Sequence, residues 1–151
     1  MKLIWKLGLA IGVAITLLLL PARVQSEQLE TFDGFLVHYN ALSSDQLPPE
    51  VAKTYGLQRS SHRGLLNITV QKDNGAAAAT PLGAVVNAYA SNLAGQRTEV
   101  PMREIREDDA IYYIGEFSVA GSDTLSFEVR IKPSGASSSH TLKFSKNYVT
   151  D

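Results

Sequence analysis

Residues 124–132, TLSFEVRIK, alternate apolar and polar side chains without exception. One face carries Leu125, Phe127, Val129 and Ile131, and the other face carries polar and charged side chains. A period of two is typical of a β-strand with one face in a core and the other in water, and aromatic and β-branched residues favour strands. The stretch therefore predicts a strand whose four apolar side chains point into the core.

Similar patterns recur along the chain and predict about eight strands, bounded by turn residues. The predicted strands are residues 28–32, 35–41, 65–72, 84–93, 98–107, 110–119, 124–132 and 140–149. Pro101 cannot donate a ladder hydrogen bond, so the fifth of these strands is expected at a sheet edge. Gly115 is a candidate bulge in the sixth. Residues 121–123 are expected to close a hairpin between the sixth and seventh strands.

One short helix is expected between the second and third strands. The run PEVAKTYG begins with Pro49, which fits the first turn of a helix, and ends with Gly56, which fits a left-handed stop. A helix of about two turns is marginal in isolation, so it must dock on the sheets. The side chains expected to hold it there are Val51, Tyr55, Leu47 and Leu57.

Strands and helices do not alternate along the chain, which argues against a parallel α/β sheet. The expected fold is all-β with one short helix: a single antiparallel β-sandwich of immunoglobulin-like character. A small closed β-barrel is the alternative, because alternation alone does not show where the sheet breaks.

The first residues have the pattern of an export signal. Two lysines precede an apolar run at residues 7–20, and small or modest side chains follow it, which predicts a cleavable signal peptide of residues 1–26. The run is shorter than the roughly 20 residues that cross a bilayer, so an uncleaved inner-membrane anchor is the lesser alternative. Residues 27–151 are expected to form one soluble periplasmic domain without stable membrane insertion.

Composition excludes several classes of protein. The absence of cysteine excludes a disulfide framework and lipoprotein acylation. Three of the 14 basic and none of the 15 acidic residues lie in residues 1–26, so 11 basic and 15 acidic residues remain, a formal charge of −4. A mildly acidic surface argues against nucleic-acid binding. Phosphate-binding glycine loops and calcium loops do not occur, and no cofactor is expected.

A short loop is the first candidate site. Arg59, His62 and Arg63 place three cationic or near-cationic groups within five residues, ahead of Gly64, where the backbone is expected to turn. Such a group can hold a carboxylate or phosphate, which predicts a small anionic ligand. The alternative is that one arginine bonds loop carbonyls or the end of the helix, and that the others are solvated.

The second candidate site is the non-core face of the second strand, with His38 and Asn40. We expect His38 to make a hydrogen bond from this face. Zinc and copper sites use three or four nitrogen or sulfur ligands. His38, His62 and His140 show no ligand spacing, so no metal site is expected; His62 and His140 are expected in solvent.

Several runs together resemble a known family of proteins. They are HYNA at 38–41, PEVAKTYGLQRSSHRGLLNITV at 49–70, NLAGQ at 92–96, REIREDDAIYYI at 103–114 and LKFSKNYVTD at 142–151. The chain is similar to a family of small exported proteins of Gram-negative bacteria catalogued as a domain of unknown function. The resemblance implies a secreted β-sandwich of this length, and it brings no catalytic or binding residues.

The leading functional hypothesis is an exported, non-catalytic module that binds an envelope protein or a small ligand through loops or a sheet edge. Three alternatives remain open. They are a hydrolase-like enzyme whose residues converge from separate strands, metal handling, and a structural or chaperone-like role. The sequence does not predict an oligomeric state.

Overall fold

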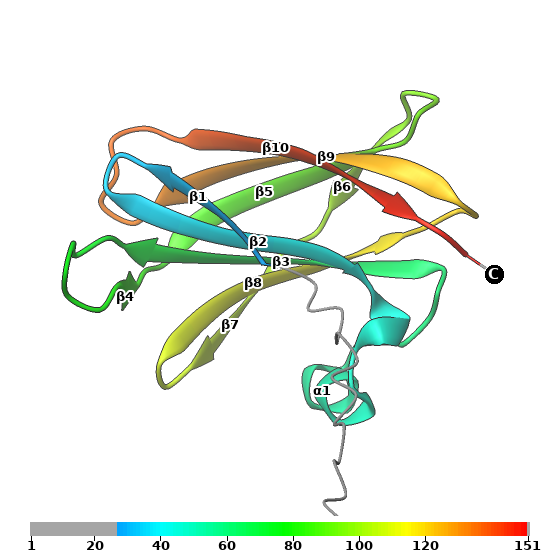
Figure 1. The fold of residues 1–151 in the computed structure, drawn as a ribbon, viewed down its shortest axis with the longest axis horizontal. Helices are drawn as coiled ribbons and strands as arrows, with labels where there is room; N and C mark the ends of the chain where they lie inside the picture. Colours follow the sequence, from blue (N-terminus) through cyan, green and yellow to red (C-terminus); the bar gives the residue numbers. More distant parts are fainter. Residues whose placement is uncertain (1–26, 151) are drawn as a thin grey trace, which may run out of the picture.

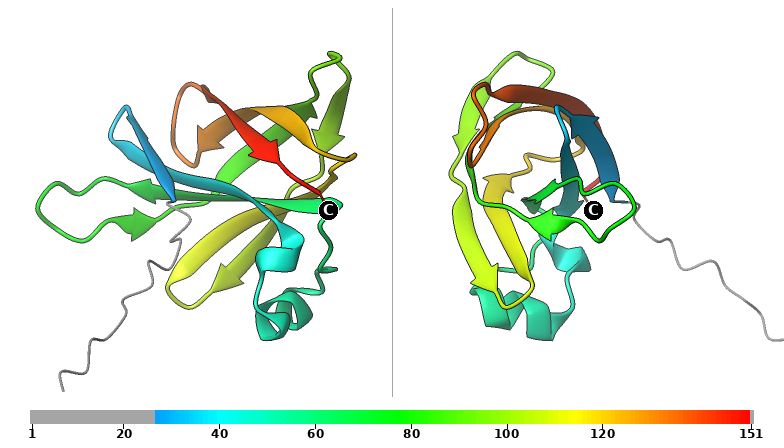
Figure 2. Two further views of the ribbon diagram at one scale, coloured as in Figure 1. Left: turned by 45° about the vertical axis from the view of Figure 1, so that its right-hand side comes forward. Right: turned by 90° about the vertical axis from the view of Figure 1, so that its left-hand side faces the viewer.

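The computed structural model describes residues 27–150, and the predicted signal peptide lies outside the described residues. The chain folds into two antiparallel sheets that pack face to face, with α1 below one of them (Figures 1 and 2). The predicted antiparallel β-sandwich is confirmed. The alternative of a closed barrel is wrong, because both sheets have free edges within the described chain.

The larger sheet has six strands in the order β1-β2-β3-β8-β7, with β4 paired to β3. Its strands are β1 (Gln28–Phe32), β2 (Phe35–Ser43), β3 (Arg63–Lys72), β4 (Thr80–Pro81), β7 (Arg103–Glu107) and β8 (Ala110–Ser118). The smaller sheet has the order β10-β9-β5-β6. Its strands are β5 (Ala84–Ser91), β6 (Arg97–Val100), β9 (Asp123–Pro133) and β10 (His140–Tyr148).

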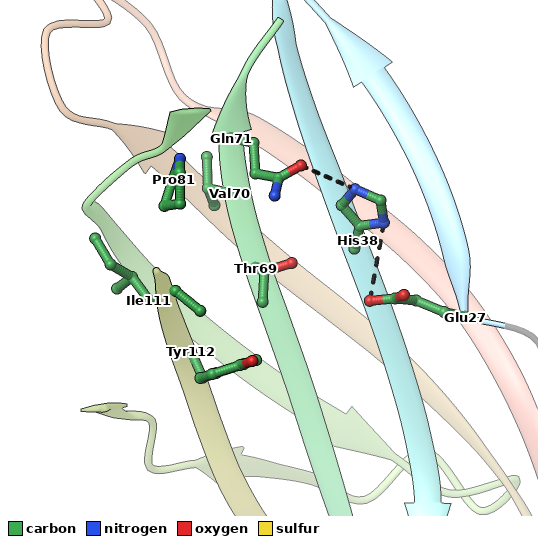
Figure 3. Close-up of a pocket in the computed structure, with 9 residues that line it drawn as sticks. Glu27, His38, Thr69, Val70, Gln71, Pro81, Ile111 and Tyr112 are labelled. Atoms are coloured by element: carbon green, nitrogen blue, oxygen red, sulfur yellow. Dashed lines mark hydrogen bonds and ion pairs between the residues drawn. The ribbon is translucent and has the colours of Figure 1, made fainter. Parts of the chain in front are cut away.

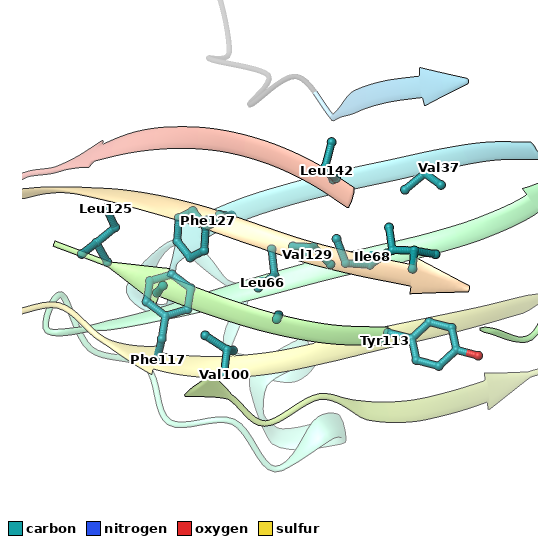
Figure 4. Packing of buried hydrophobic residues seen from close by; sticks show 14 of the residues in the cluster. Val37, Leu66, Ile68, Val100, Tyr113, Phe117, Leu125, Phe127, Val129 and Leu142 are labelled. Carbon is teal, nitrogen blue, oxygen red and sulfur yellow. The ribbon is translucent and has the colours of Figure 1, made fainter. Parts of the chain in front are cut away.

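The core lies between the sheets and is organised by β9. Leu125, Phe127, Val129 and Ile131 are all buried, as the alternation predicted. They face the inward side chains of the larger sheet, such as Leu66 (Figure 4). Because β9 pairs with β10 on one side and β5 on the other, burial of its apolar face holds the smaller sheet on the larger one.

Residues 98–107 do not form one strand. They form the end of β6 and the whole of β7, which belong to different sheets, and Pro101 lies in the link between them. Proline has no N–H for the ladder, so the chain leaves one sheet there and enters the other. Both strands lie at sheet edges, so the predicted edge position is confirmed.

Gly115 is not a bulge, because the register between β3 and β8 runs without a break past it. It lies instead where the link between β6 and β7 presses on β8. A Cβ at this position would lie 2.5 Å from Met102 Sδ and 2.7 Å from Val100 Cγ1. Glycine is required here by close packing.

Residues 121–123 do not close a hairpin. β8 pairs with β3 and β7, whereas β9 pairs with β5 and β10, so the chain crosses between the sheets at this point. Before it crosses, Val119 is buried, and its backbone N–H donates to the His62 carbonyl at 2.9 Å. This bond keeps the chain beside β3 for one residue beyond the end of β8.

The helix α1 (Pro49–Tyr55) follows a 3-10 turn at Ser44–Gln46 and ends at Gly56, whose φ is 66°, as predicted. The docking face differs from the prediction in part. Ala52 is the buried residue of the helix, Tyr55 packs against the same cluster as predicted, and Val51 is 36% exposed at the cavity between the helix and the sheet. Leu47 and Leu57 pack beside the helix as expected. None of the helices between residues 27 and 150 is long and apolar enough to span a bilayer.

Candidate functional site

The two arginines of the predicted loop site both have partners. Arg59 Nη2 donates to the Asp45 carbonyl at 2.8 Å. Arg63 lies in β3, and its Nη1 is 3.7 Å from Glu116 Oε1. Buried Ser44 holds the loop in place. Its hydroxyl donates to the Gln58 carbonyl at 2.8 Å, and its Oγ accepts a hydrogen bond from the Ser60 backbone N–H at 3.0 Å. The structure therefore does not direct both guanidinium groups at a common ligand position.

The end of this loop differs from the expectation in its backbone. Gly64 does not turn the chain but continues β3, and the Phe117 ring covers it. His62 Nδ1 is 3.3 Å from Ser61 Oγ, and the His62 backbone N–H donates to Ser60 Oγ at 3.1 Å. These contacts lie within the loop.

His38 lies on the outer face of the larger sheet, as predicted, in a polar pocket of about 200 Å³. Its Nε2 is 3.2 Å from Gln71 Oε1, and its Nδ1 is 3.8 Å from Glu27 Oε1 (Figure 3). The expected hydrogen bond from the non-core face is thus confirmed. Thr69 and Tyr112 also line the pocket, which we call the His38 pocket. Asn40 lines a different cavity.

A second cavity on the same face lies between α1 and the sheet and has a volume of about 250 Å³. We call it the α1 groove. Its lining is apolar except for one carboxamide and two phenols, and comprises Leu42, Leu47, Val51, Tyr55, Leu57, Leu65, Asn67, Ile105, Tyr112 and Ile114. It exists because outward positions of β2, β3, β7 and β8 carry apolar side chains that α1 covers only in part.

Asn67 is the polar group of the groove floor. Its Oδ1 is buried and has no hydrogen-bond partner among the described residues. A buried acceptor without a donor costs about 1–3 kcal/mol. Asn67 and Thr69 are successive outward residues of β3, roughly 7 Å apart, and Tyr112 lines both cavities, so the α1 groove and the His38 pocket adjoin.

The rim of the groove is tied to the edge strand β7. The Tyr55 hydroxyl donates to the Glu107 carboxylate, and Arg103 donates to the Tyr55 carbonyl. The hydrogen bond to Glu107 raises the pKa of Tyr55. A cation at the C-terminal end of a helix also interacts favourably with the helix dipole. These contacts fix the last turn of α1 over the sheet.

Two histidine–carboxylate pairs lie near the edge strand β1, on opposite faces of the sheet. One is His38 with Glu27, and the other is His140 with Glu30, at 2.5 Å between Nε2 and Oε1. The prediction that His140 is solvated is wrong, since its ring stacks on Phe32 with centroids 4.1 Å apart. Among residues 27–150, no three His, Asp or Glu side chains gather as a possible metal site.

Asn67 was not among the predicted site residues. The alternating pattern predicts that outward positions of the strands face water, so a polar residue at such a position does not indicate a binding site. The available signal was that Leu65, Ile105 and Ile114 are also outward, which indicates that part of this face is covered.

The sequence matches the family model described as "Domain of unknown function (DUF4426)" over residues 29–151, which confirms the predicted resemblance. A DUF4426 family protein from Pseudomonas aeruginosa PAO1 has a crystal structure with 31% sequence identity and a TM-score of 0.71, covering 85% of this chain and 98% of that chain. A search of curated proteins gives no match.

Two more distant structures share the fold. FetP of uropathogenic Escherichia coli strain F11, recombinantly expressed in the periplasm, is 14% identical with a TM-score of 0.56, covering 82% of this chain and 93% of that chain. A copper-bound variant of Campylobacter jejuni P19 is 12% identical with a TM-score of 0.52, covering 81% and 94%. At these identities the likeness shows the fold alone.

Proposed function

Because the chain belongs to the DUF4426 family, whose function is unknown, we propose a function from its own geometry: a non-catalytic, periplasmic module that binds a small amphiphile. The binding site is the outer face of the larger sheet. The α1 groove takes the aromatic or aliphatic part of the ligand, and the adjoining His38 pocket takes its polar end.

The unpartnered Asn67 Oδ1 in the apolar α1 groove carries this proposal. A ligand with an N–H or O–H next to its apolar part would satisfy that acceptor while it fills the groove. The groove alone is smaller than the 300–1,000 Å³ typical of drug-sized ligands, and the two adjoining cavities together reach that range. The site therefore fits a small molecule better than a partner helix.

The polar end offers both donors and acceptors. The His38 pocket presents an imidazole, the Gln71 carboxamide, the Glu27 carboxylate and the Thr69 hydroxyl. A few polar groups beside an apolar cavity are typical of sites that orient one end of a ligand.

The histidine contacts support a non-catalytic role. Nucleophilic or acid–base catalysis needs a base within hydrogen-bond reach of its partners. Within the described chain, His62 is near a hydroxyl, His140 is near a carboxylate, and His38 bonds a carboxamide. None of the three has both a carboxylate and a hydroxyl within that reach.

Metal handling is the second candidate, favoured by the fold shared with the copper-bound P19 variant. Each histidine–carboxylate pair of this chain offers two ligands, whereas zinc and copper sites use three or four. Metal analysis of the protein purified from its native host separates the two functions. Stoichiometric copper that is lost on changing His38 or His140 to Ala would favour metal handling.

Export is part of the proposal and is supported by the signal pattern of residues 1–26. The likeness in fold to FetP, which was expressed in the periplasm, agrees with it. Mass spectrometry of protein from a periplasmic extract tests it. A mass that matches a chain beginning at Glu27 supports export with cleavage. A mass that matches a chain retaining residue 1 contradicts the cleavage.

The binding proposal is tested with N-phenyl-1-naphthylamine, an apolar dye with one N–H donor. We expect saturable fluorescence enhancement with the purified domain. Val51→Trp fills the rim of the groove and should abolish it. Val85→Trp is the matched control, because Val85 is 62% exposed on the outer face of the other sheet. Equal binding by both variants would place the dye elsewhere.

The role of Asn67 is tested with a ligand pair. In 1-benzylnaphthalene a CH₂ group replaces the N–H of the dye, so its affinity, measured by displacement, lacks the hydrogen bond. We expect the wild-type protein to prefer the N–H compound by about 5–10-fold, as a hydrogen bond of about 1 kcal/mol or slightly more requires. Asn67→Leu should lose this preference, and Asn87→Leu, on the exposed face of β5, should keep it.

A further inference from the structure

A cleft opens where the two sheets part, between β2 and β10. β1 pairs with β2 only from Phe35 to Tyr39, so residues 40–43 have no strand beside them on that side within the described chain. β10 is the edge strand of the other sheet. Between them lies a cavity of about 320 Å³, the Lys146 cleft, whose lining includes Gln28, Asn40, Ala41, Phe144, Lys146 and Asn147.

Lys146 occupies a core-facing position of β10. It alternates with Leu142, Phe144 and Tyr148, and it lies directly opposite buried Leu125 of β9. Partial burial removes water from the ammonium and lowers the pKa of Lys146. A lysine that interrupts an apolar series in a strand is costly unless its charge has a partner.

No carboxylate of residues 27–150 lies within ion-pair distance of Lys146. Lys143, on the opposite face of the same strand, shows the contrast, because its Nζ is 3.5 Å from Glu128 Oε2. The other residues of the cleft are uncharged, and Gln28, whose β2 partner Tyr39 faces the core, carries a carboxamide that can donate hydrogen bonds. The cleft therefore holds a positive charge and neutral donors, and no negative charge.

We propose that the Lys146 cleft binds the carboxylate of a small monoanion. The Lys146 ammonium makes a charge-assisted hydrogen bond to the carboxylate, and the carboxamide of Gln28, which pairs with core-facing Tyr39, supplies a further donor. Phe144 and Ala41 pack against a short apolar stem. A single lysine charge matches one negative charge and leaves a dianionic phosphate half neutralised. This site is separate from the α1 groove, and it does not depend on the function proposed above.

The test is thermal unfolding of the purified domain in sodium butyrate and in sodium chloride at equal ionic strength. We expect stabilisation by butyrate that grows with the logarithm of its concentration above the Kd: at ten times the Kd, the ratio of folded to unfolded protein rises by about 11-fold. Lys146→Met should abolish this response. The variant should fold, because methionine has a similar length and the substitution removes a partly desolvated charge. Lys143→Met is the matched control and should respond as the wild type does.

Three outcomes overturn the proposal. They are equal stabilisation of the wild type by butyrate and chloride, a butyrate response that survives Lys146→Met, and a loss of response in Lys143→Met as great as in Lys146→Met. Stabilisation by inorganic phosphate equal to that by butyrate would overturn the choice of a carboxylate.

Discussion

Substitution of Gly64 by alanine should destabilise the fold through a clash with one aromatic ring. Gly64 of β3 and Phe117 of β8 are directly opposite in the register, and both face the core. A Cβ on Gly64 would lie 2.1 Å from the Cε2 and Cζ atoms of Phe117. Carbon atoms in contact are about 3.5–4.0 Å apart, so the ring would have to move by roughly 1.5 Å.

The ring has little room for this movement. Phe117 packs edge-on against Phe127, with centroids 5.0 Å apart, and against Tyr148, at 5.7 Å. Overpacking of this kind costs about 1–3 kcal/mol. Alanine in a strand gains about 0.5–1 kcal/mol over glycine, because the unfolded chain loses less freedom on folding. We therefore expect Gly64→Ala to lower the free energy of unfolding by about 1–2 kcal/mol, or Tm by roughly 3–10 °C.

Urea unfolding followed by far-UV circular dichroism measures this change, and a double-mutant cycle assigns it to the ring. Phe117→Leu removes the atoms that clash, so Gly64→Ala should cost at least about 1 kcal/mol less in that background. Gly83→Ala is the matched control. A Cβ there would lie 3.2 Å from Ser134 Oγ and 3.3 Å from Arg106 Nη2, both at the ends of flexible side chains, and at an ordinary contact distance of 3.8 Å from the Tyr113 hydroxyl, so the change should stay within about 0.5 kcal/mol.

Either of two results would refute this reasoning. One is a Gly64→Ala protein as stable as the wild type, which would mean that the ring moves freely. The other is strict additivity in the cycle, which would mean that the loss arises from the β3 backbone and not from the ring.

Four further predictions follow from three single residues. Tyr148→Phe should raise the free energy of unfolding by about 1 kcal/mol, because the buried hydroxyl has no partner among the described residues; unchanged urea midpoints would contradict this. Burial also raises the pKa of Tyr148, so the wild type should lose stability as the pH rises above about 10, where the unfolded tyrosine ionises, and the variant should lose less. Gly34→Ala should cost about 1 kcal/mol in the same assay, since φ is 78° in the β1–β2 turn; a stabilised variant would rule out that turn. This protein, once purified from a periplasmic extract, should show no tryptophan emission, because Trp5 is the only tryptophan and lies in the predicted signal peptide. An emission band typical of tryptophan would mean that the signal peptide is retained.

Most strands were predictable because they have one face in the core, as in residues 124–132. The division into two sheets was not. Pro101 indicated an edge, and the chain does run along an edge on both sides of it, but a period of two carries no information about which sheet a strand joins. For the same reason residues 121–123 resembled a hairpin turn although they connect the two sheets.

The α1 groove shows the same limit for a binding site. An apolar outward residue in one strand, such as Ile114, carries no signal alone. The register places Ile114 beside Asn67 on one side and Arg103 on the other, and Ile105 beside Tyr112. Only this pairing gathers the apolar side chains into one patch that α1 partly covers.

Charge density along the sequence was a poor guide to the available charge. The segment around Arg59 and Arg63 was the predicted cationic site, but the fold gives one arginine a carbonyl and the other a carboxylate. Lys146 has no charged neighbour in the sequence, and the fold leaves it partly buried without a carboxylate of residues 27–150 beside it. A group that already has a hydrogen-bond or ion-pair partner within the fold must give it up or share it to bind a ligand, so a ligand is bound more favourably by a group that folding leaves unpartnered. The Asn67 carboxamide and the Lys146 ammonium meet that condition, and only the three-dimensional structure shows that they do.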